Sequence, residues 1–176
     1  MGEGRGGSEA EQFVARGRYT VIPRTLIFLR HGDDVLLLKG APTKRLWAGR
    51  YNGLGGHVEP GETIAAAALR ECREEAGLAP EDIEGLTLRA LINVEGDGAR
   101  VGGPGVLLCV FVGVARTRAV APSREGTPEW IPIADLGRVD LVDGDRLLPR
   151  LLTGEGLLFG HQRYDGAGQL GAFTLA

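Results

Sequence analysis

The fold is decided by residues 52–78, "NGLGGHVEPGETIAAAALRECREEAGL", where a loop rich in glycine runs directly into a helix. The sequence predicts this helix from Thr63 to Ala76. Thr63 is a favourable N-cap residue, and Gly77 suits the left-handed backbone of a C-terminal cap. Residues 70–75, RECREE, place three glutamates and two arginines in less than two helical turns. Such crowding of charge needs a physical reason.

The predicted helix has two distinct faces, because each residue advances by about 100° around the axis. The apolar face, which should pack on the core, consists of Ala65, Leu69, Cys72 and Ala76. The other face carries Glu71, Glu74 and Glu75. One interpretation is a solvated acidic face, with Arg70 and Glu74 as an ordinary i, i+4 surface pair. The other is a hard-cation site, since the loop would bring backbone carbonyls near three carboxylates and oxygen ligands suit Mg²⁺ or Mn²⁺.

The spacing of these residues resembles the Nudix box, G-x5-E-x7-R-E-U-x-E-E-x-G-U, in which U is a bulky aliphatic residue. Its fixed positions are occupied by Gly56, Glu62, Arg70, Glu71, Glu74, Glu75 and Gly77. Leu78 fits the second U position, whereas Cys72 departs from the first. A small apolar residue there should leave the metal side of the helix undisturbed. The resemblance implies the Nudix fold, an α/β/α sandwich with a mixed β-sheet, and therefore the α+β class.

The resemblance also implies an enzyme that hydrolyses a nucleoside diphosphate linked to another group. In such an enzyme Glu71, Glu74 and Glu75 would hold divalent ions, Mg²⁺ or Mn²⁺, with help from the carbonyl of Gly56. Bound ions polarise phosphoryl oxygens and lower the pKa of the attacking water. Arg70 would brace the carboxylates. We therefore expect Arg70, Glu74 and Glu75 to belong to the catalytic centre.

A proton acceptor for the attacking water is expected in or near the same centre. Residues 123–130, SREGTPEW, resemble a loop of the MutT branch that supplies a further carboxylate. Glu125 is the first candidate on this basis, and Glu129 is the second. Glu125 also suits a turn before Pro128, and the glutamates of the box are themselves possible bases. The sequence leaves the choice open.

The substrate expectation comes from two further segments. Residues 51–63 and 141–166 resemble the branch that hydrolyses 8-oxo-purine nucleoside triphosphates. By that resemblance, Asn52 and Asp143 would read the edge of the nucleobase by hydrogen bonding. Asn52 equally suits a left-handed turn before a glycine.

The same branch differs from this chain at two positions. Its human-type members have a tryptophan at the position of Leu141 and a second aspartate at that of Gly144. The residue that would stack on the base and the second acid that would read it are therefore both missing at these positions. Lys39 and Arg50 are candidates for contacts with the substrate phosphates, although each also suits a solvated strand end.

Residues 17–176 are predicted to form a single domain, preceded by a mobile tail of residues 1–16 that is rich in Gly, Glu and Arg. Strands are expected over residues 19–30, 34–40, 85–95, 105–115, 129–136 and 172–176. The first two should form a hairpin. A second short helix is expected within residues 143–154, and Pro149 should limit it to an opening turn or kink it.

Composition narrows the class of function. The chain is 43% apolar and 24% charged, as is ordinary for a globular protein. Its net charge is −3 and the charges are interspersed, which argues against nucleic acid as a partner. We find neither a signal-peptide core nor a membrane span, and interpret Cys72 and Cys109 as buried thiols, so we expect a cytoplasmic protein. The sequence carries no signal for an oligomeric state.

Three alternatives compete with a nucleoside triphosphate hydrolase. The stretch "LIFLRHGDD", residues 26–34, resembles the entry of histidine phosphatases, in which His31 would be the nucleophile and a helix would follow. A Nudix-fold sensor would bind a nucleotide without cleaving it, although such modules typically lose carboxylates that this chain keeps. Hydrolysis of ADP-ribose or a sugar nucleotide is the third. Trp47 and Trp130 suit either a pocket wall or the core.

Overall fold

The computed structural model describes residues 18–44, 47–96, 104–142, 144–165 and 170–176 of the chain. The strands are β1 (Val21–His31), β2 (Asp34–Gly40), β3 (Tyr51–Asn52), β4 (Ile83–Glu95), β5 (Gly105–Ala115), β6 (Gly126–Pro132), β7 (Leu158–Tyr164) and β8 (Leu170–Leu175). The helices are α1 (Ile64–Ala76) and α3 (Gly144–Thr153), with 3-10 turns η2 (Pro80–Asp82) and η3 (Ile133–Arg138). The expected tail, residues 1–16, lies outside the described residues.

The strands form one mixed sheet, as the sequence predicts. Their order is β3-β2-β1-β5-β4-β7-β8, and β6 pairs with β2. Two pairs, β1 with β5 and β4 with β7, are parallel, whereas β1–β2, β4–β5 and β7–β8 are antiparallel. The α+β class and the mixed sheet are therefore confirmed.

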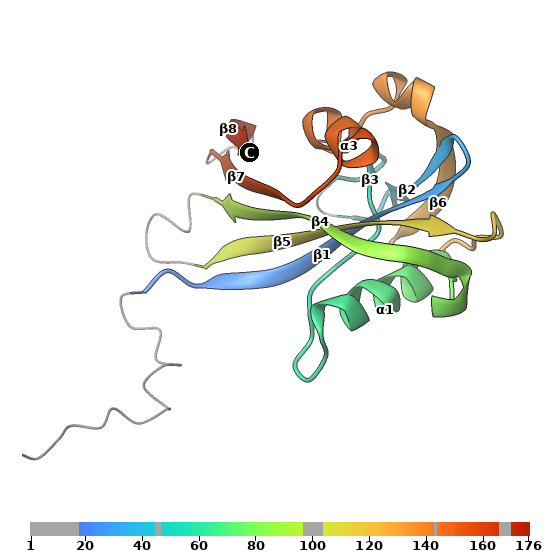
Figure 1. The fold of residues 1–176 in the computed structure, drawn as a ribbon, viewed down its shortest axis with the longest axis horizontal. Helices are drawn as coiled ribbons and strands as arrows, with labels where there is room; N and C mark the ends of the chain where they lie inside the picture. The colour runs from blue at the N-terminus through green and yellow to red at the C-terminus, as the bar shows by residue number, and fades with distance from the viewer. Residues whose placement is uncertain (1–17, 45–46, 97–103, 143, 166–169) are drawn as a thin grey trace, which may run out of the picture.

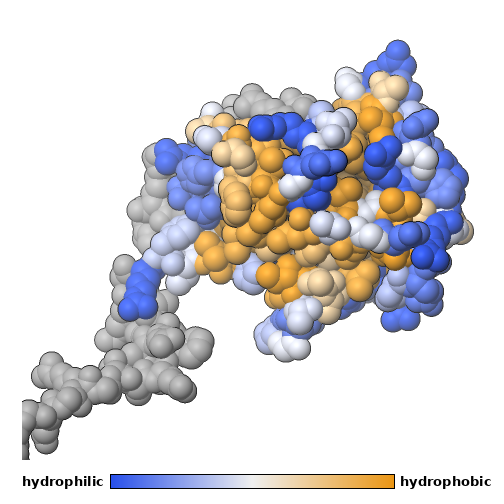
Figure 2. Space-filling model, in the orientation of Figure 1, coloured by the Kyte–Doolittle hydropathy of each residue, from blue (hydrophilic) through white to orange (hydrophobic). Residues whose placement is uncertain are grey.

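The two helices lie on opposite sides of the sheet, α1 below and α3 above it in Figure 1. Alternate residues of β1 serve the two sides: Ile27 and Leu29 pack in the core cluster that contains α1, and Phe28 in the cluster that contains α3. Figure 2 shows apolar residues gathered over the middle of the visible face, with hydrophilic residues among them and along the right-hand edge. No helix in the described ranges is long and apolar enough to cross a membrane.

Helix α1 begins and ends where the sequence predicts. The Thr63 side chain accepts a hydrogen bond from the amide of Ala66, and Gly77 has φ of 74°, in the left-handed region. The predicted core face is wrong at Ala65, which is exposed, and the acidic face is not solvated as a whole. Glu71 and Glu75 are buried beneath the preceding loop.

Helix α3 continues through Pro149 instead of stopping at an opening turn. Leu147, Leu148 and Leu151 are buried in the core cluster on this side of the sheet. Their burial offsets the hydrogen bond that proline cannot donate.

Three strands differ from expectation. β6 starts and ends earlier than the strand predicted over residues 129–136, and the last part of that predicted strand lies in η3. The sequence gives no prediction for β3 and β7, and both carry residues of the candidate site. The histidine phosphatase alternative is excluded, because the strand β2, not a helix, follows His31.

Candidate active site

The glycine-rich loop before α1 is held along the N-terminal half of β1 by short backbone hydrogen bonds. The amide of Ile27 donates to the carbonyl of Leu54 at 2.7 Å, and that of Thr25 to the carbonyl of Gly56 at 2.8 Å. A Cβ atom on Gly55 would lie 2.2 Å from the Thr25 carbonyl oxygen, and φ at Gly55 is 140°. Only glycine permits this approach. The loop therefore lies close enough to β1 to cover the carboxylates of α1.

Arg70 is the centre of the charge cluster that the sequence places on α1. Its guanidinium donates hydrogen bonds to Glu62 at 2.9 and 3.2 Å, to Glu71 at 2.9 Å, to Glu74 at 3.1 Å and to the carbonyl of His57 at 2.9 Å. These bonds lower the pKa of Glu62 below its ordinary value, chiefly through Arg70. Arg70 thus joins three carboxylates to the loop.

Glu71 and Glu75 are buried carboxylates, with 9% and 3% of their surfaces exposed. Burial raises the pKa of Glu71 even though Arg70 opposes the shift. Burial also raises the pKa of Glu75 to about 7, against the hydrogen bond that the Gly55 amide donates to its Oε2 at 2.7 Å. Both carboxylates are therefore costly to ionise without a nearby positive charge.

The four predicted metal ligands do not form a closed ligand cluster. No three His, Cys, Asp or Glu side chains in the described part of the chain are gathered as a metal site. Glu71 and Glu74 face Arg70, and Glu75 faces Gly55. The donor set nevertheless fits a hard cation, because all donors are oxygens and two are carboxylates with raised pKa values. A Cβ on Gly56 would lie 2.3 Å from Glu71 Oε1, so only glycine leaves that carboxylate room.

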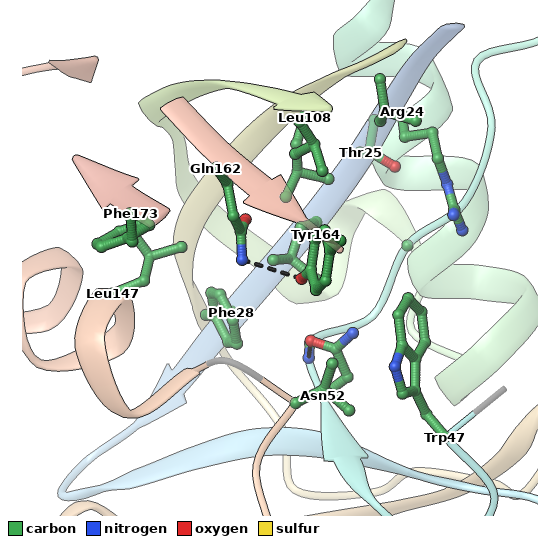
Figure 3. A pocket seen from close by; sticks show the side chains of 16 residues that line it. Arg24, Thr25, Phe28, Trp47, Asn52, Leu108, Leu147, Gln162, Tyr164 and Phe173 are labelled. Atoms are coloured by element: carbon green, nitrogen blue, oxygen red, sulfur yellow. Dashed lines mark hydrogen bonds between the residues drawn. The ribbon is translucent and has the colours of Figure 1, made fainter. Parts of the chain in front are cut away.

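A cavity of about 350 Å³, here the first cavity, lies on the α3 side of the sheet (Figure 3). Most of its lining is apolar and comes from β1, β4, β5, α3 and β8. Its polar side chains include Asn52, Thr25, Gln162 and Tyr164. Asn52 Oδ1 accepts a hydrogen bond from the Gly53 amide at 2.9 Å, which directs the Nδ2 donor elsewhere.

A smaller second cavity, of about 60 Å³, adjoins the first and reaches Glu75. Arg24, Lys44 and Arg50 contribute three positive charges to its lining. Five residues line both cavities: Arg24, Trp47, Asn52, Gly53 and Gly55. An apolar chamber therefore adjoins a smaller one that is lined by three cationic side chains and by Glu75 of the acidic helix.

Glu125, the first candidate for the general base, lies beside Lys44, which lines the second cavity. Its Oε2 is 2.7 Å from Lys44 Nζ, and its backbone carbonyl accepts a hydrogen bond from the Ala41 amide. Its charge contributes to the raised pKa of Glu75. Glu129 accepts a hydrogen bond from the Tyr51 hydroxyl at 2.7 Å. Neither glutamate is among the residues that line the two cavities, and Glu125 adjoins the second one through Lys44.

The remaining residues that were predicted to contact the substrate have different positions in the structure. Lys39 Nζ lies 5.3 Å from the centre of the Tyr51 ring, and Lys39 lines neither cavity. Arg50 lines the second cavity, but it also donates to Asp140 at 3.0 Å and to the Leu141 carbonyl at 2.7 Å. Asp143 lies outside the described residues.

The two tryptophans have different places. Trp47 lines both cavities, is 39% exposed and has φ of 61°, the one non-glycine residue with a left-handed φ among those described. Trp130 donates to the Arg118 carbonyl at 3.0 Å and stacks edge-on with His31, away from both cavities. Of the two, Trp47 is thus a pocket wall.

Sequence reasoning missed several cavity residues: Arg24, Thr25, Lys44, Gln162 and Tyr164. Arg24 and Thr25 interrupt an otherwise apolar strand, and this polar interruption was the available signal. Gln162 and Tyr164 lie on β7, whose mixed sequence LFGHQRY has no clear alternation of apolar residues.

Comparisons with known proteins agree with this arrangement. The NUDIX domain family model matches residues 21–151, which is most of the chain. The oxidized purine nucleoside triphosphate hydrolase of Mus musculus is 28% identical over 152 residues, covering 86% of this chain and 92% of that protein. The uncharacterized Nudix hydrolase YvcI of Bacillus subtilis is 25% identical over 158 residues, covering 89% and 96%.

A solved structure supports the same fold. The MutT protein of Bacillus halodurans superposes with a TM-score of 0.74 at 23% identity, covering 88% of this chain and 97% of that one. Nudix hydrolases act on small nucleotide substrates and generally use divalent metal ions. On the match over residues 21–151, the chain belongs to the Nudix family and is a Nudix hydrolase.

Proposed function

We propose that this hydrolase converts a purine nucleoside triphosphate, in particular one with an 8-oxo-purine base, to the nucleoside monophosphate and pyrophosphate, with Mg²⁺ or Mn²⁺. The name of the mouse relative, an oxidized purine nucleoside triphosphate hydrolase, supports this substrate class. The observation that best supports the proposal is the pair of adjoining cavities. An apolar chamber suits a nucleoside, and the adjoining chamber with three cationic side chains suits its phosphates.

The metal would be held by Glu71, Glu74 and Glu75, with the carbonyl of Gly56 as a further oxygen donor. That carbonyl accepts one hydrogen bond, from Thr25, and has a second lone pair. When bound, the ion would polarise the phosphoryl oxygens and make the attacking water more acidic. Arg70 would keep Glu71 and Glu74 in place through its hydrogen bonds.

The protein's own cations would orient the phosphate chain. Lys44 and Arg24 line the second cavity, and phosphate oxygens accept strongly from both side chains. Arg50, which is tied to Asp140 and Leu141, would also hold the β3 end of the cavity in shape. Asn52 would donate from Nδ2 to the nucleoside where the two cavities meet. Asp143 stays a candidate for a contact with the nucleobase.

The reaction forms a bond between the water oxygen and a phosphorus, and breaks the bridging P–O bond between the α- and β-phosphates. The water proton must pass to a nearby carboxylate. We assign this role to Glu125. A phosphate chain beside Lys44 would compete with Glu125 for that ammonium, and a carboxylate released from its ion pair is a better proton acceptor.

A substrate screen tests the proposal. Pyrophosphate and phosphate release would be measured with Mg²⁺ and with Mn²⁺ on 8-oxo-dGTP, the four canonical deoxynucleoside triphosphates, ADP-ribose, sugar nucleotides and dinucleoside polyphosphates. Selective pyrophosphate release from 8-oxo-dGTP is expected. Preferred turnover of ADP-ribose would contradict the substrate class, and tight nucleotide binding without turnover would favour a sensor.

A further inference from the structure

Gln162 is a buried polar residue in an apolar part of the first cavity. It is 6% exposed and lies on β7, opposite Val94 of β4 and Phe173 of β8. Both neighbours also line the cavity, as does Leu147 of α3. An amide in such surroundings lowers stability unless its polar atoms find partners. An apolar side chain would suit this position better if it served packing alone.

The Gln162 amide makes one hydrogen bond within the described chain. Its Nε2 donates to the Tyr164 hydroxyl at 2.9 Å, shown dashed in Figure 3. Nε2 carries a second N–H, and Oε1 is an acceptor. The side chain can therefore present one donor and one acceptor, side by side, to a molecule in the cavity. Tyr164 limits the directions in which they point.

The position of Gln162 in the cavity indicates which part of a nucleotide it would meet. The phosphate end is marked by the residues that line both cavities, among them Arg24 and Gly55. Gln162, Phe173 and Leu147 line only the first cavity. A nucleotide with its phosphates beside Lys44 would thus direct its base toward Gln162.

We propose that Gln162 reads the edge of the nucleobase and selects an oxidised guanine over guanine. This inference rests on the function proposed above. Guanine presents two adjacent acceptors, N7 and O6, which do not complement one amide. Oxidation at C8 places a hydrogen on N7, so the same edge then presents a donor beside an acceptor. Glutamine binds the donor and acceptor of the adenine N6/N7 edge in this two-bond manner.

The decisive variant is Gln162→Leu, which removes the amide and keeps most of the volume. We expect kcat/KM for 8-oxo-dGTP to fall about 10- to 100-fold, and that for dGTP to change less than about threefold. The melting temperature should not fall, because the substitution removes a buried polar group from apolar surroundings. Equal losses on both nucleotides, or unchanged selectivity, would overturn the inference.

Two further variants separate readout from damage to the strand. Tyr164→Phe should reduce selectivity by a smaller factor, because the amide then loses its anchor. His161→Gln changes the residue just before Gln162, whose side chain points to the opposite face of β7 from Gln162 and Tyr164, and should leave selectivity unchanged. A loss of selectivity in His161→Gln as large as that in Gln162→Leu would count against the assignment.

A binding measurement separates failure of this inference from failure of the proposed function. Dissociation constants of 8-oxo-dGMP and dGMP would be measured by calorimetry in the presence of a chelator. If the wild-type protein cleaves no triphosphate, the proposed function fails, yet this ratio still tests Gln162. A wild-type preference for 8-oxo-dGMP that is lost in Gln162→Leu supports the readout. An equal ratio in both proteins, or no preference in the wild type, refutes it.

Discussion

The two sides of the sheet differ in the number and connection of their polar groups. On the α1 side, charged groups are crowded and highly connected, since one guanidinium contacts Glu62, Glu71, Glu74 and a backbone carbonyl. On the α3 side, few polar groups stand in an apolar chamber, and the Gln162 side chain makes one hydrogen bond among the described residues. Phosphate chemistry needs strong fields, whereas base selection needs few, well-placed partners. Substitutions on the first side should therefore affect rate and stability, and those on the second side selectivity.

The largest effect is expected from Glu75→Gln. This carboxylate is a proposed metal ligand that lines the second cavity, and the amide cannot replace its charge. We expect kcat to fall by about 10³-fold or more at saturating Mg²⁺, measured as pyrophosphate release. Glu84→Gln makes the same chemical change at an exposed site on β4 and should be neutral. Full activity in Glu75→Gln would remove the proposed role of the acidic side.

The next effect is on stability. Arg70→Met keeps an apolar stem but removes every hydrogen bond to the three carboxylates. In a chelator, we expect the free energy of unfolding to fall by about 3 kcal/mol, because buried Glu71 would lose its partner. Urea unfolding measures this loss. Arg73→Met, at an exposed position of the same helix, is the matched control. Equal free energies of unfolding in the two variants would mean that the hydrogen bonds of Arg70 do not stabilise the fold.

The pH dependence of stability should reveal buried Glu75. Its pKa is raised to about 7 in the folded protein, from 4.5. The folded state therefore binds this proton more tightly, and the stabilisation, complete below pH 4.5, is lost as pH rises to about 7. In a chelator we expect a loss of about 1–3 kcal/mol over this interval. Glu75→Gln should lack this slope. A wild-type slope equal to that of the variant would contradict the shift.

The smallest effect concerns Asn52. Asn52→Ala should raise KM about tenfold for the preferred purine nucleotide and less for a pyrimidine nucleotide. Asn52→Asp keeps an oxygen to accept from the Gly53 amide but removes the Nδ2 donor. If Asn52 contacts the substrate, both variants lose selectivity. Rescue by Asp, or equal effects on the two nucleotides, would show that Asn52 only shapes the turn.

The α1 side could be predicted from sequence because its signals are local. The cap at Thr63, the left-handed Gly77 and the fixed spacing of the acidic residues all lie within one continuous segment. Burial of Glu71 and Glu75 was not predicted. A helical wheel places residues on a face, but it does not say that a loop pinned to β1 covers that face.

The α3 side was harder because its residues are brought together by strand pairing. Gln162 reaches the cavity through the parallel pairing of β7 with β4, more than sixty residues earlier in the chain. The mixed sequence of β7 hides its strand character, because its polar Gln162 faces inward. Lys39 and Arg50 were both plausible phosphate ligands, and only the structure shows that Arg50 lines the second cavity whereas Lys39 lies over the Tyr51 ring.

The loop pinned to β1 has a thermodynamic consequence. Gly55 donates its amide to Glu75 and also lines both cavities. A ligand in the first cavity that shifts the Gly55 backbone would change the hydrogen bond that Glu75 accepts at the second cavity. Linkage is reciprocal, so the factor by which a nucleotide alters cation affinity must equal the factor by which the cation alters nucleotide affinity. Under the proposed function, one glycine amide would thereby make the nucleotide and the cation heterotropic effectors of each other.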